Sequence, residues 1–164
     1  GYAEYTIPDV GAPAFGAAPA WLRTGRVRDV AMSDWSSNAL VVSKSNGAGS
    51  FVKQSFQITS GYFQPFGVAA GRVNDDNTVD VAVVCQSGQE GDGGLVLEMN
   101  YGSDPLQFAE YAYPLDPTIH DKPCFVEIGD LNRDTRNDIA VTANSSYRLY
   151  VWLNNLPPPP TDGN

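Results

Sequence analysis

The chain has 164 residues and is acidic, because 10 lysines and arginines stand against 19 aspartates and glutamates and give a formal net charge of −9. This length is enough for one domain, or for a few small repeated units with a buried core, and the hydrophobic share of 42% is that of a globular protein. The acidic balance argues against nucleic-acid binding and against an anionic membrane surface, and no apolar run approaches the roughly 18 residues that span a bilayer.

Short apolar segments rich in Val, Ile, Phe and Tyr follow one another along the chain, and Gly, Asn, Asp and Ser separate them. This pattern is typical of β-strands joined by tight turns, whereas no segment keeps a helical period. The sequence therefore predicts an all-β chain. The segments expected to be strands are 38–44, 50–59, 67–73, 78–84, 94–101, 106–113, 124–131, 138–143 and 148–154.

Three stretches share one frame: an apolar strand, a glycine, a polar loop, and then an aspartate followed by a β-branched run. These stretches are 21–34, 67–86 and 125–144, with frame glycines Gly25, Gly71 and Gly129. A second hairpin follows each stretch, and the last is cut short after RLYVWLNN. We therefore predict three propeller-blade-like units of about four antiparallel strands, the last incomplete. The expected units are 17–60, 61–116 and 117–154, within a repeat domain of residues 17–154.

The polar loop of the third unit places oxygen-bearing side chains at Asp130, Asn132, Asp134 and Asp138. The backbone carbonyl of Arg136 would add a further oxygen. Hard divalent cations take six or more oxygen ligands, and carboxylates so close in sequence repel one another unless a cation neutralises them. The loop is therefore a candidate calcium site. The alternative interpretation is an Asx-turn, hydrogen-bonded to its own backbone.

The third loop and its strands, GDLNRDTRNDIAV, resemble the FG-GAP or VCBS-type repeat of integrin α-chain β-propellers and related secreted proteins. That family's pattern reads roughly G-D-[FL]-N-x-D-G-x-x-D-[IL]-A-V. The resemblance covers residues 17–154 and is closest in the third unit. It implies a propeller-type fold, an extracellular location and a structural calcium ion held by the five loop residues named above. It departs from the family at Thr135, where the family has glycine.

The corresponding loop of the second unit has Arg72 where the family has its first carboxylate. We expect the Arg72 guanidinium to pair with Asp76 or Asp80 and so to take the place of an ion. The weaker metal loop that the resemblance implies here would use Asn74, Asp76, Thr78 and Asp80. In the first unit, TGRVRDVAM is expected to run almost straight through without a loop. In every unit the loop would stabilise a turn and do no chemistry.

Two cysteines and one histidine limit the chemistry that the chain can carry. Cys85 and Cys124 lie in apolar, strand-like runs and are either two buried free thiols or one disulfide. Together with His120, the only histidine, they are too few for a zinc site. The sequence has no GxSxG, GK[ST] or HExxH motif, and no GxGxxG motif that opens a helix. We therefore expect a protein that is not an enzyme, without catalytic residues.

Two segments indicate modification outside the cell. Asn144-Ser145-Ser146 is an N-glycosylation sequon at a predicted turn. The C-terminal segment, residues 155–164, contains Pro157, Pro158, Pro159 and Pro160, which predict a polyproline II rod. The run resembles the Pro-rich segments of hydroxyproline-rich glycoproteins, whose hydroxylated prolines carry O-glycans. A linker between domains is the alternative.

Three blades do not close a propeller ring, which takes about four to eight. The missing surface must come from another copy, from a separate subunit, or from a different packing of the units. Residues 1–16 contain the extended pattern GYAEYTIPDV and are expected to supply an additional strand to the short third unit. That strand would close the unit in its own chain or enter a neighbouring copy, and head-to-tail donation that does not close builds a filament.

The leading hypothesis is a secreted, non-enzymatic structural or adhesive module whose copies assemble into a fibre or a surface coat. Its expected partners are copies of itself and glycans, with neither nucleic acid nor membrane insertion. The alternative is a carbohydrate-binding propeller that uses Trp21, Trp35, Trp152 and the eight tyrosines as stacking platforms. Trp35 and Trp152 lie in or beside predicted strands, which favours a core role for them. A propeller enzyme with carboxylates at a channel mouth has no motif to support it.

Overall fold

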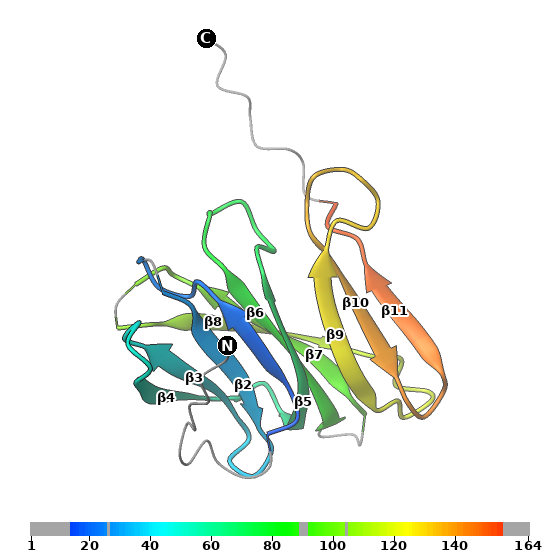
Figure 1. The fold of residues 1–164 in the computed structure, drawn as a ribbon. Coiled ribbons are helices and arrows are strands. Elements are labelled where there is room, and N and C mark those ends of the chain that lie inside the picture. The colour runs from blue at the N-terminus through cyan, green and yellow to red at the C-terminus, as the bar shows by residue number, and fades with distance from the viewer. Residues whose placement is uncertain (1–13, 26, 89–91, 104, 156–164) are drawn as a thin grey trace, which may run out of the picture.

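The computed structural model describes residues 14–25, 27–88, 92–103 and 105–155, and within them it is all-β. Its 11 strands form three antiparallel sheets, which lie side by side from left to right in Figure 1. The first sheet contains β1 (Ala17–Ala20), β2 (Asp29–Asp34), β3 (Ala39–Ser45) and β4 (Phe51–Gln57). The second contains β5 (Tyr62–Gly71), β6 (Asp80–Gly88), β7 (Gly94–Asn100) and β8 (Phe108–Pro114). The third contains β9 (Pro123–Gly129), β10 (Asp138–Ala143) and β11 (Arg148–Trp152).

The all-β prediction is confirmed, and each expected unit holds one of the three sheets. Every sheet is a meander in which consecutive strands pair, and the third has three strands where the others have four. The described residues include no helix long and apolar enough to cross a membrane. The expected N-terminal strand falls largely on residues 1–13, and the proline run falls on residues 156–164. Both segments lie outside the described residues.

The second sheet is the central layer, and its strand β6 is buried on both faces. In β6, Val81 and Val83 pack against the first sheet, while Ala82 and Val84 pack against the third. All four side chains are fully buried. This explains why the run VAVVC is apolar at every position, whereas a strand with one solvent-facing side would alternate between apolar and polar residues.

The first two strands of all three sheets share one register. The matching pairs are Ala20 with Asp29, Gly71 with Asp80, and Gly129 with Asp138. The connecting loops 21–28, 72–79 and 130–137 therefore have equal length. The expectation that the first unit lacks its loop is wrong. Gly25 lies within this loop, and the frame position belongs to Ala20, whose small side chain is buried in the core between the first two sheets.

Two glycines let the first strands of successive sheets approach one another closely. A Cβ at Gly16 would lie 2.7 Å from the carbonyl oxygen of Phe66, and one at Gly67 would lie 2.5 Å from that of Cys124. Such distances exclude any side chain. Gly16 lies four residues before Ala20, and Gly67 lies four residues before Gly71. Ala20 and Gly71 are the residues that pair with the buried aspartate of their sheets. The residue at this position in β9 is Phe125, which is 66% exposed.

A buried carboxyl group lies in the core between the first two sheets. Glu98 of β7 is 3% exposed, and its Oε1 atom has no hydrogen-bond partner. Glu110 lies directly opposite on β8 and accepts hydrogen bonds from the backbone N–H and the hydroxyl of Thr59. Burial, and after it the negative charge of Glu110, raises the pKa of Glu98 to about 7. The neutral form of Glu98 is therefore the one that fits the core.

We predict that Glu98 makes folding stability fall as the pH rises. Its pKa is about 7 in the folded chain and near the ordinary glutamate value of 4.5 in the unfolded chain, so its contribution is complete below about pH 4.5 and is lost as the pH rises through about 7. Glu98→Gln removes this dependence and raises the unfolding free energy at about pH 8 by on the order of 1–3 kcal/mol. Urea unfolding at about pH 5 and about pH 8 measures both effects.

The matched control is Glu127→Gln, because Glu127 is an exposed glutamate of β9. It should leave the pH dependence of the unfolding free energy unchanged. Equal pH dependence in Glu98→Gln and in the unmodified chain would contradict the prediction.

Candidate functional site

The aspartate that opens the second strand of each sheet is fully buried and joins a loop to the end of the third strand. In the third sheet, Asp138 Oδ2 accepts a hydrogen bond from the Leu131 backbone N–H at 2.9 Å, and Oδ1 accepts one from the Asn154 N–H at 2.8 Å. The corresponding donors to Asp80 in the second sheet are the N–H groups of Val73 and Asn100, at 3.1 and 2.9 Å. We call this arrangement the aspartate clamp.

The first sheet has the same clamp, but one of its hydrogen-bond donors is a side chain. Asp29 accepts a hydrogen bond from the Ser45 N–H at 2.9 Å, at the end of the third strand as in the other sheets. The guanidinium of Arg23 supplies the loop contact through two bonds of 2.9 and 2.7 Å. A bidentate guanidinium thus replaces the backbone N–H that the other two loops provide.

Two asparagines next to the clamps tie each sheet to the one before it. The Asn100 side-chain amide donates to the carbonyl oxygen of Leu22 at 2.7 Å, and the Asn154 amide donates to that of Val73 at 3.0 Å. Leu22 and Val73 each lie two residues after the residue that pairs with the clamp aspartate of their sheet. The contact between the first and second sheets is therefore repeated between the second and third.

The candidate calcium loop of the third unit satisfies its polar groups internally. Asp130 accepts hydrogen bonds from three backbone N–H groups of the loop, the shortest at 2.6 Å. Asn132 Oδ1 accepts one from the Asp134 N–H at 2.9 Å. The Arg136 N–H and then other contacts hold the pKa of Asp134 below its usual range, and the Arg136 guanidinium binds that carboxylate at 2.7 Å. Asp138 is engaged in its clamp.

These contacts are those of the Asx-turn, the alternative that the sequence left open. A calcium ion does not fit the donor set as it is arranged, because a guanidinium already neutralises Asp134 and backbone N–H groups engage Asp130 and Asp138. No group of three or more His, Cys, Asp or Glu side chains in the described part of the chain is placed to hold a metal ion. Thr135 adopts a φ of 72° although it is β-branched, and its N–H donates to Asp130.

The loop of the second unit is also an Asx-turn. The Asn74 amide donates to Asp76 at 2.8 Å, and the Thr78 N–H does so at 2.9 Å. Burial raises the pKa of Asp76. The hydrogen bonds from the Thr78 hydroxyl, the Thr78 N–H and Asn74, together with the Arg72 charge, lower it by more, so the pKa lies below its usual range. The Arg72 guanidinium donates to Asn77 at 3.5 Å, and its charge acts on Asp76 at longer range.

Both cysteines are free thiols, which is one of the two alternatives that the sequence allowed. Cys85 packs into the core between the first and second sheets. Cys124 belongs to β9, in the sheet that covers the opposite face of the second sheet, and its sulfur accepts a hydrogen bond from the Gln86 amide at 3.7 Å. Burial raises the pKa of Cys85, which keeps the thiol protonated and unreactive.

The sequon lies in the turn between β10 and β11, and Asn144 is exposed there. The hydroxyl of its third residue, Ser146, donates to the buried carboxylate of Asp121 at 2.6 Å. His120, the only histidine, contacts Asp92. The proline run, Pro157 to Pro160, lies outside the described residues, so the structure does not bear on its modification.

The ring faces of the three tryptophans contact other side chains. Trp35 lies in an aromatic cluster with two phenylalanines. Trp152 stacks on Tyr150 with ring centroids 6.0 Å apart. Trp21 is half exposed, but the Arg28 guanidinium lies 4.0 Å above its ring. These contacts involve the tryptophan rings, whereas Tyr101 and Tyr147 are 65% and 93% exposed.

The third sheet ends in an edge strand without the usual protection. Among the described strands β11 pairs only with β10. The outer strands of the other sheets, β4 and β8, carry Lys53 and Glu110 near their centres. After Arg148, β11 continues as Leu-Tyr-Val-Trp without a charge. Charged residues on edge strands discourage pairing with other chains, so the edge of β11 is open to a further strand.

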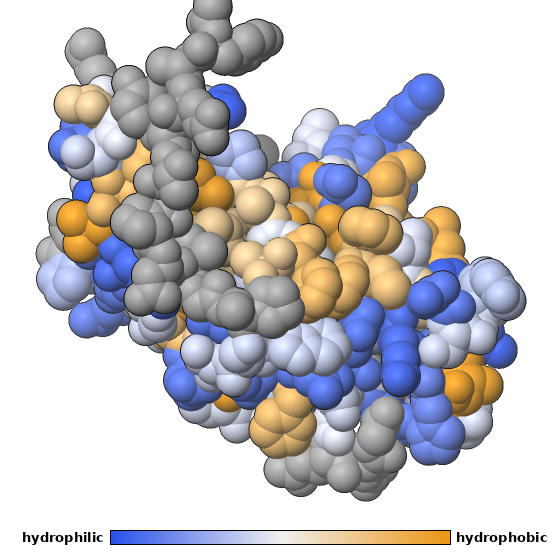
Figure 2. Space-filling model, turned by 60° about the horizontal axis from the view of Figure 1, so that its bottom comes forward, coloured by the Kyte–Doolittle hydropathy of each residue, from blue (hydrophilic) through white to orange (hydrophobic). Residues whose placement is uncertain are grey.

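Apolar side chains also cover the face of the third sheet that points away from the second. Phe125 is 66% exposed, Leu149 is 63% exposed, and Val151 is partly exposed on the same face. Figure 2 shows orange, apolar atoms reaching the surface at the right of the view, on the side where the third sheet stands in Figure 1. Sequence reasoning missed this surface, because an alternating pattern does not reveal that a face lacks a covering partner.

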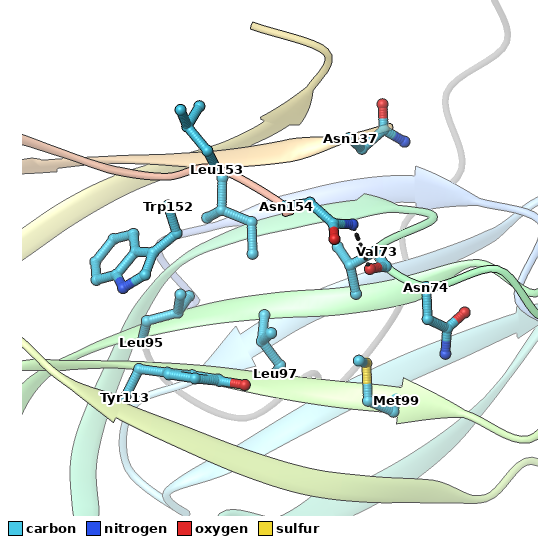
Figure 3. Close-up of a pocket in the computed structure, with 11 residues that line it drawn as sticks. Val73, Asn74, Leu95, Leu97, Met99, Tyr113, Asn137, Trp152, Leu153 and Asn154 are labelled. Carbon is cyan, nitrogen blue, oxygen red and sulfur yellow. Dashed lines mark hydrogen bonds between the residues drawn. The ribbon is translucent and has the colours of Figure 1, made fainter. Parts of the chain in front are cut away.

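A cavity of about 290 Å³ lies between β7 and the end of the third sheet (Figure 3). It exists because the third sheet has no fourth strand among the described residues. Between the first two sheets, Phe56 of β4 packs edge-on against Phe108 of β8, with ring centroids 4.8 Å apart. The opposite face of β8 is uncovered, so Tyr111 and Tyr113 are 53% and 40% exposed. The residues lining the cavity include Leu95, Leu97, Met99, Tyr113, Trp152 and Leu153.

The sequence matches no protein-family model, and no curated protein is similar to it at a significant level. The candidate site is therefore defined by its geometry: the open edge of β11, the apolar outward face of the third sheet, and the cavity beside them. We refer to the cavity as the slot.

We predict that the aspartate clamp is essential for folding. Asp138→Ala leaves the N–H groups of Leu131 and Asn154 without their acceptor at a buried site, and should lower the free energy of unfolding by about 2–4 kcal/mol. Urea unfolding measures the loss. The matched control is Asp75→Ala in an exposed part of the loop 72–79, which should change the unfolding free energy little. A similar loss in both variants would contradict the role of the clamp.

We also predict that calcium leaves the stability of the chain unchanged, because the third loop satisfies its own polar groups and Arg136 already places a positive charge on Asp134. The melting temperature should be equal in millimolar calcium chloride and in an excess of chelator. A saturable rise in melting temperature with calcium would contradict this prediction and would identify the third loop as an ion site.

Proposed function

We propose that the chain is a secreted, non-enzymatic structural or adhesive module of three FG-GAP-like blade units, and that copies assemble through the open edge of β11. The observation that carries this proposal is the three-stranded third sheet, whose last strand presents an apolar edge without a central charge. Such edges add strands from other chains through main-chain hydrogen bonds, and the side-chain pockets beside them give specificity.

The repeated contacts between sheets support the blade interpretation. The clamp, the asparagine tie and the close glycine contact each recur at corresponding positions of successive sheets. A ring of such blades takes about four or more, so the three of one chain leave strand edges to be covered. The asparagine tie and the glycine contact each occur between the first and second sheets and again between the second and third. This repetition favours one architectural rule over three independent hairpins.

Phe125 favours completion at the edge over stacking of a further blade on the outward face. A further sheet that packed like the others would have to approach β9 at the position that Gly16 and Gly67 hold in β1 and β5. Phe125 fills that position with a side chain. An added strand beside β11 requires no such approach.

An extracellular location is supported by the exposed sequon at Asn144 and by the resemblance to secreted repeat proteins. Carbohydrate binding, the alternative hypothesis, has less support because the tryptophan ring faces contact other side chains. Calcium has no part in the proposal. The net charge of −9 makes copies repel one another, so assembly should strengthen as salt screens that repulsion.

We predict that a lysine in the middle of β11 prevents assembly. Val151→Lys places a charge at the centre of the open edge and should shift the chain to monomers, as followed by sedimentation velocity and negative-stain electron microscopy. The matched control is Val52→Lys, because Val52 is an exposed valine on the outer strand β4 of the first sheet. It should assemble like the unmodified chain.

Two results would contradict the proposal. One is an unmodified chain that stays monomeric at high concentration and high salt. The other is a Val151→Lys chain that assembles like the unmodified one.

A further inference from the structure

We propose that the slot accepts residues 2–7 of a second copy, which add to β11 as the fourth strand of the third sheet. This inference rests on the proposed function, and it names the donor segment and the surface that receives it. The surface consists of the open edge of β11 together with the apolar walls of the slot.

The residues that follow β11 do not supply this strand in the way that the other sheets do. In the first and second sheets, the fourth strand returns directly after the short connections 46–50 and 101–107. After β11 the sequence enters Pro157 to Pro160, and proline has no backbone N–H with which to pair. Pro157 to Pro160 are therefore unsuited to pair as a strand directly beside β11.

Residues 2–7 have the sequence of a half-buried strand that fits an apolar slot. Ala3, Tyr5 and Ile7 would lie on one face of the strand, and Tyr2, Glu4 and Thr6 would lie on the other. Pro8 then ends the segment, as Pro114 ends β8. Residues 1–13 lie outside the described part of the chain, so this pattern is read from their sequence alone.

The contact between the first two sheets indicates what the slot lacks. Phe56 pairs with Leu40 across its sheet, and Tyr113 pairs with Leu95, so Tyr113 occupies in the second sheet the position of Phe56 in the first. Phe56 has an aromatic partner, Phe108, on the next sheet. Tyr113 has no such strand over it, and its ring borders the slot in Figure 3. Tyr5 at the centre of the donor segment would be its partner.

The rim of the slot carries charges of both signs. A polar hollow lined by Arg72, Arg136 and Asp75 adjoins the slot, and the two share Asn74, Asn137 and Asn154. Arg136 is already paired with Asp134. A strand antiparallel to β11 enters at this rim, at the same end as Asn154. Glu4, one residue before Tyr5, then lies near the two guanidinium groups.

A second copy is the donor that covers all of the apolar surface at once. A strand from the same chain would fill the edge and the slot, but it would leave the outward face with Phe125, Leu149 and Val151 exposed. Another copy delivers the strand and also brings a body to cover this face. Exposed apolar surface that continues into an open edge is typical of such interfaces.

The test is cross-linking between two full-length chains, each in a Cys124→Ser background and each with one new cysteine. One chain carries Tyr5→Cys and the other Tyr113→Cys, while Cys85 remains buried and unreactive. After mixing and oxidation by copper phenanthroline, we expect a disulfide-linked heterodimer on a non-reducing gel, confirmed by mass spectrometry. The control Tyr2→Cys points to the other face of the strand and should form much less of it.

A second variant tests the slot without cysteines. Met99→Trp fills the slot from its floor and should weaken assembly at least tenfold, with Met99→Leu as the control that keeps the volume. Circular dichroism confirms that both variants are folded. Unchanged assembly of folded Met99→Trp would overturn the slot as the acceptor.

The outcomes separate this inference from the proposed function. A disulfide that forms only within a chain carrying both Tyr5→Cys and Tyr113→Cys overturns donation between copies. If Val151→Lys prevents assembly but the Tyr5→Cys and Tyr113→Cys chains form no cross-link, the donor segment is overturned and the proposed function stands. Absence of any assembly overturns both.

Discussion

A buried carboxylate that accepts hydrogen bonds at both of its oxygens holds each sheet together. Asp29, Asp80 and Asp138 are fully buried, and a charge removed from water is tolerated only when hydrogen bonds compensate it. Each aspartate therefore fixes its loop and the end of its third strand at one place. In the second and third sheets, that end carries the asparagine that reaches back to the preceding sheet. The loops, the register and the contact between sheets all depend on this interaction.

The same interaction explains how the third sheet can pack against the second while the outer edge of β11 has no neighbouring strand among the described residues. Asp138 holds Asn154 in place, and the Asn154 amide donates to Val73 of the second unit as Asn100 donates to Leu22 of the first. Neither contact requires a fourth strand, so β9, β10 and β11 keep their places without one. The result is a stable scaffold that presents an open strand edge and an apolar face, which suits association between copies better than it suits catalysis in a cleft.

The strands β3 to β11 could be predicted because β-branched runs and turn residues alternate clearly, whereas β1 and β2 were not among the expected strands. The loop of the first unit was missed because Ala20 performs the packing that glycine performs elsewhere. Calcium and an Asx-turn could not be separated by sequence, because the same oxygens serve a cation or backbone N–H groups. In the structure these oxygens accept backbone N–H groups, and the Arg136 guanidinium contacts Asp134. The slot was beyond prediction, because it depends on which strands far apart in sequence face one another.

Phe125 has a consequence for how such a protein can grow in evolution. Tandem duplication adds units to a repeat protein only if the last unit can receive the next, and here that would first require replacement of the phenylalanine by glycine. A sheet duplicated after the third would therefore meet a phenylalanine where the existing sheets meet a glycine, and it could not pack as closely as they do. The side chain at this one position decides whether a repeated unit can be accommodated on the outward face of the third sheet.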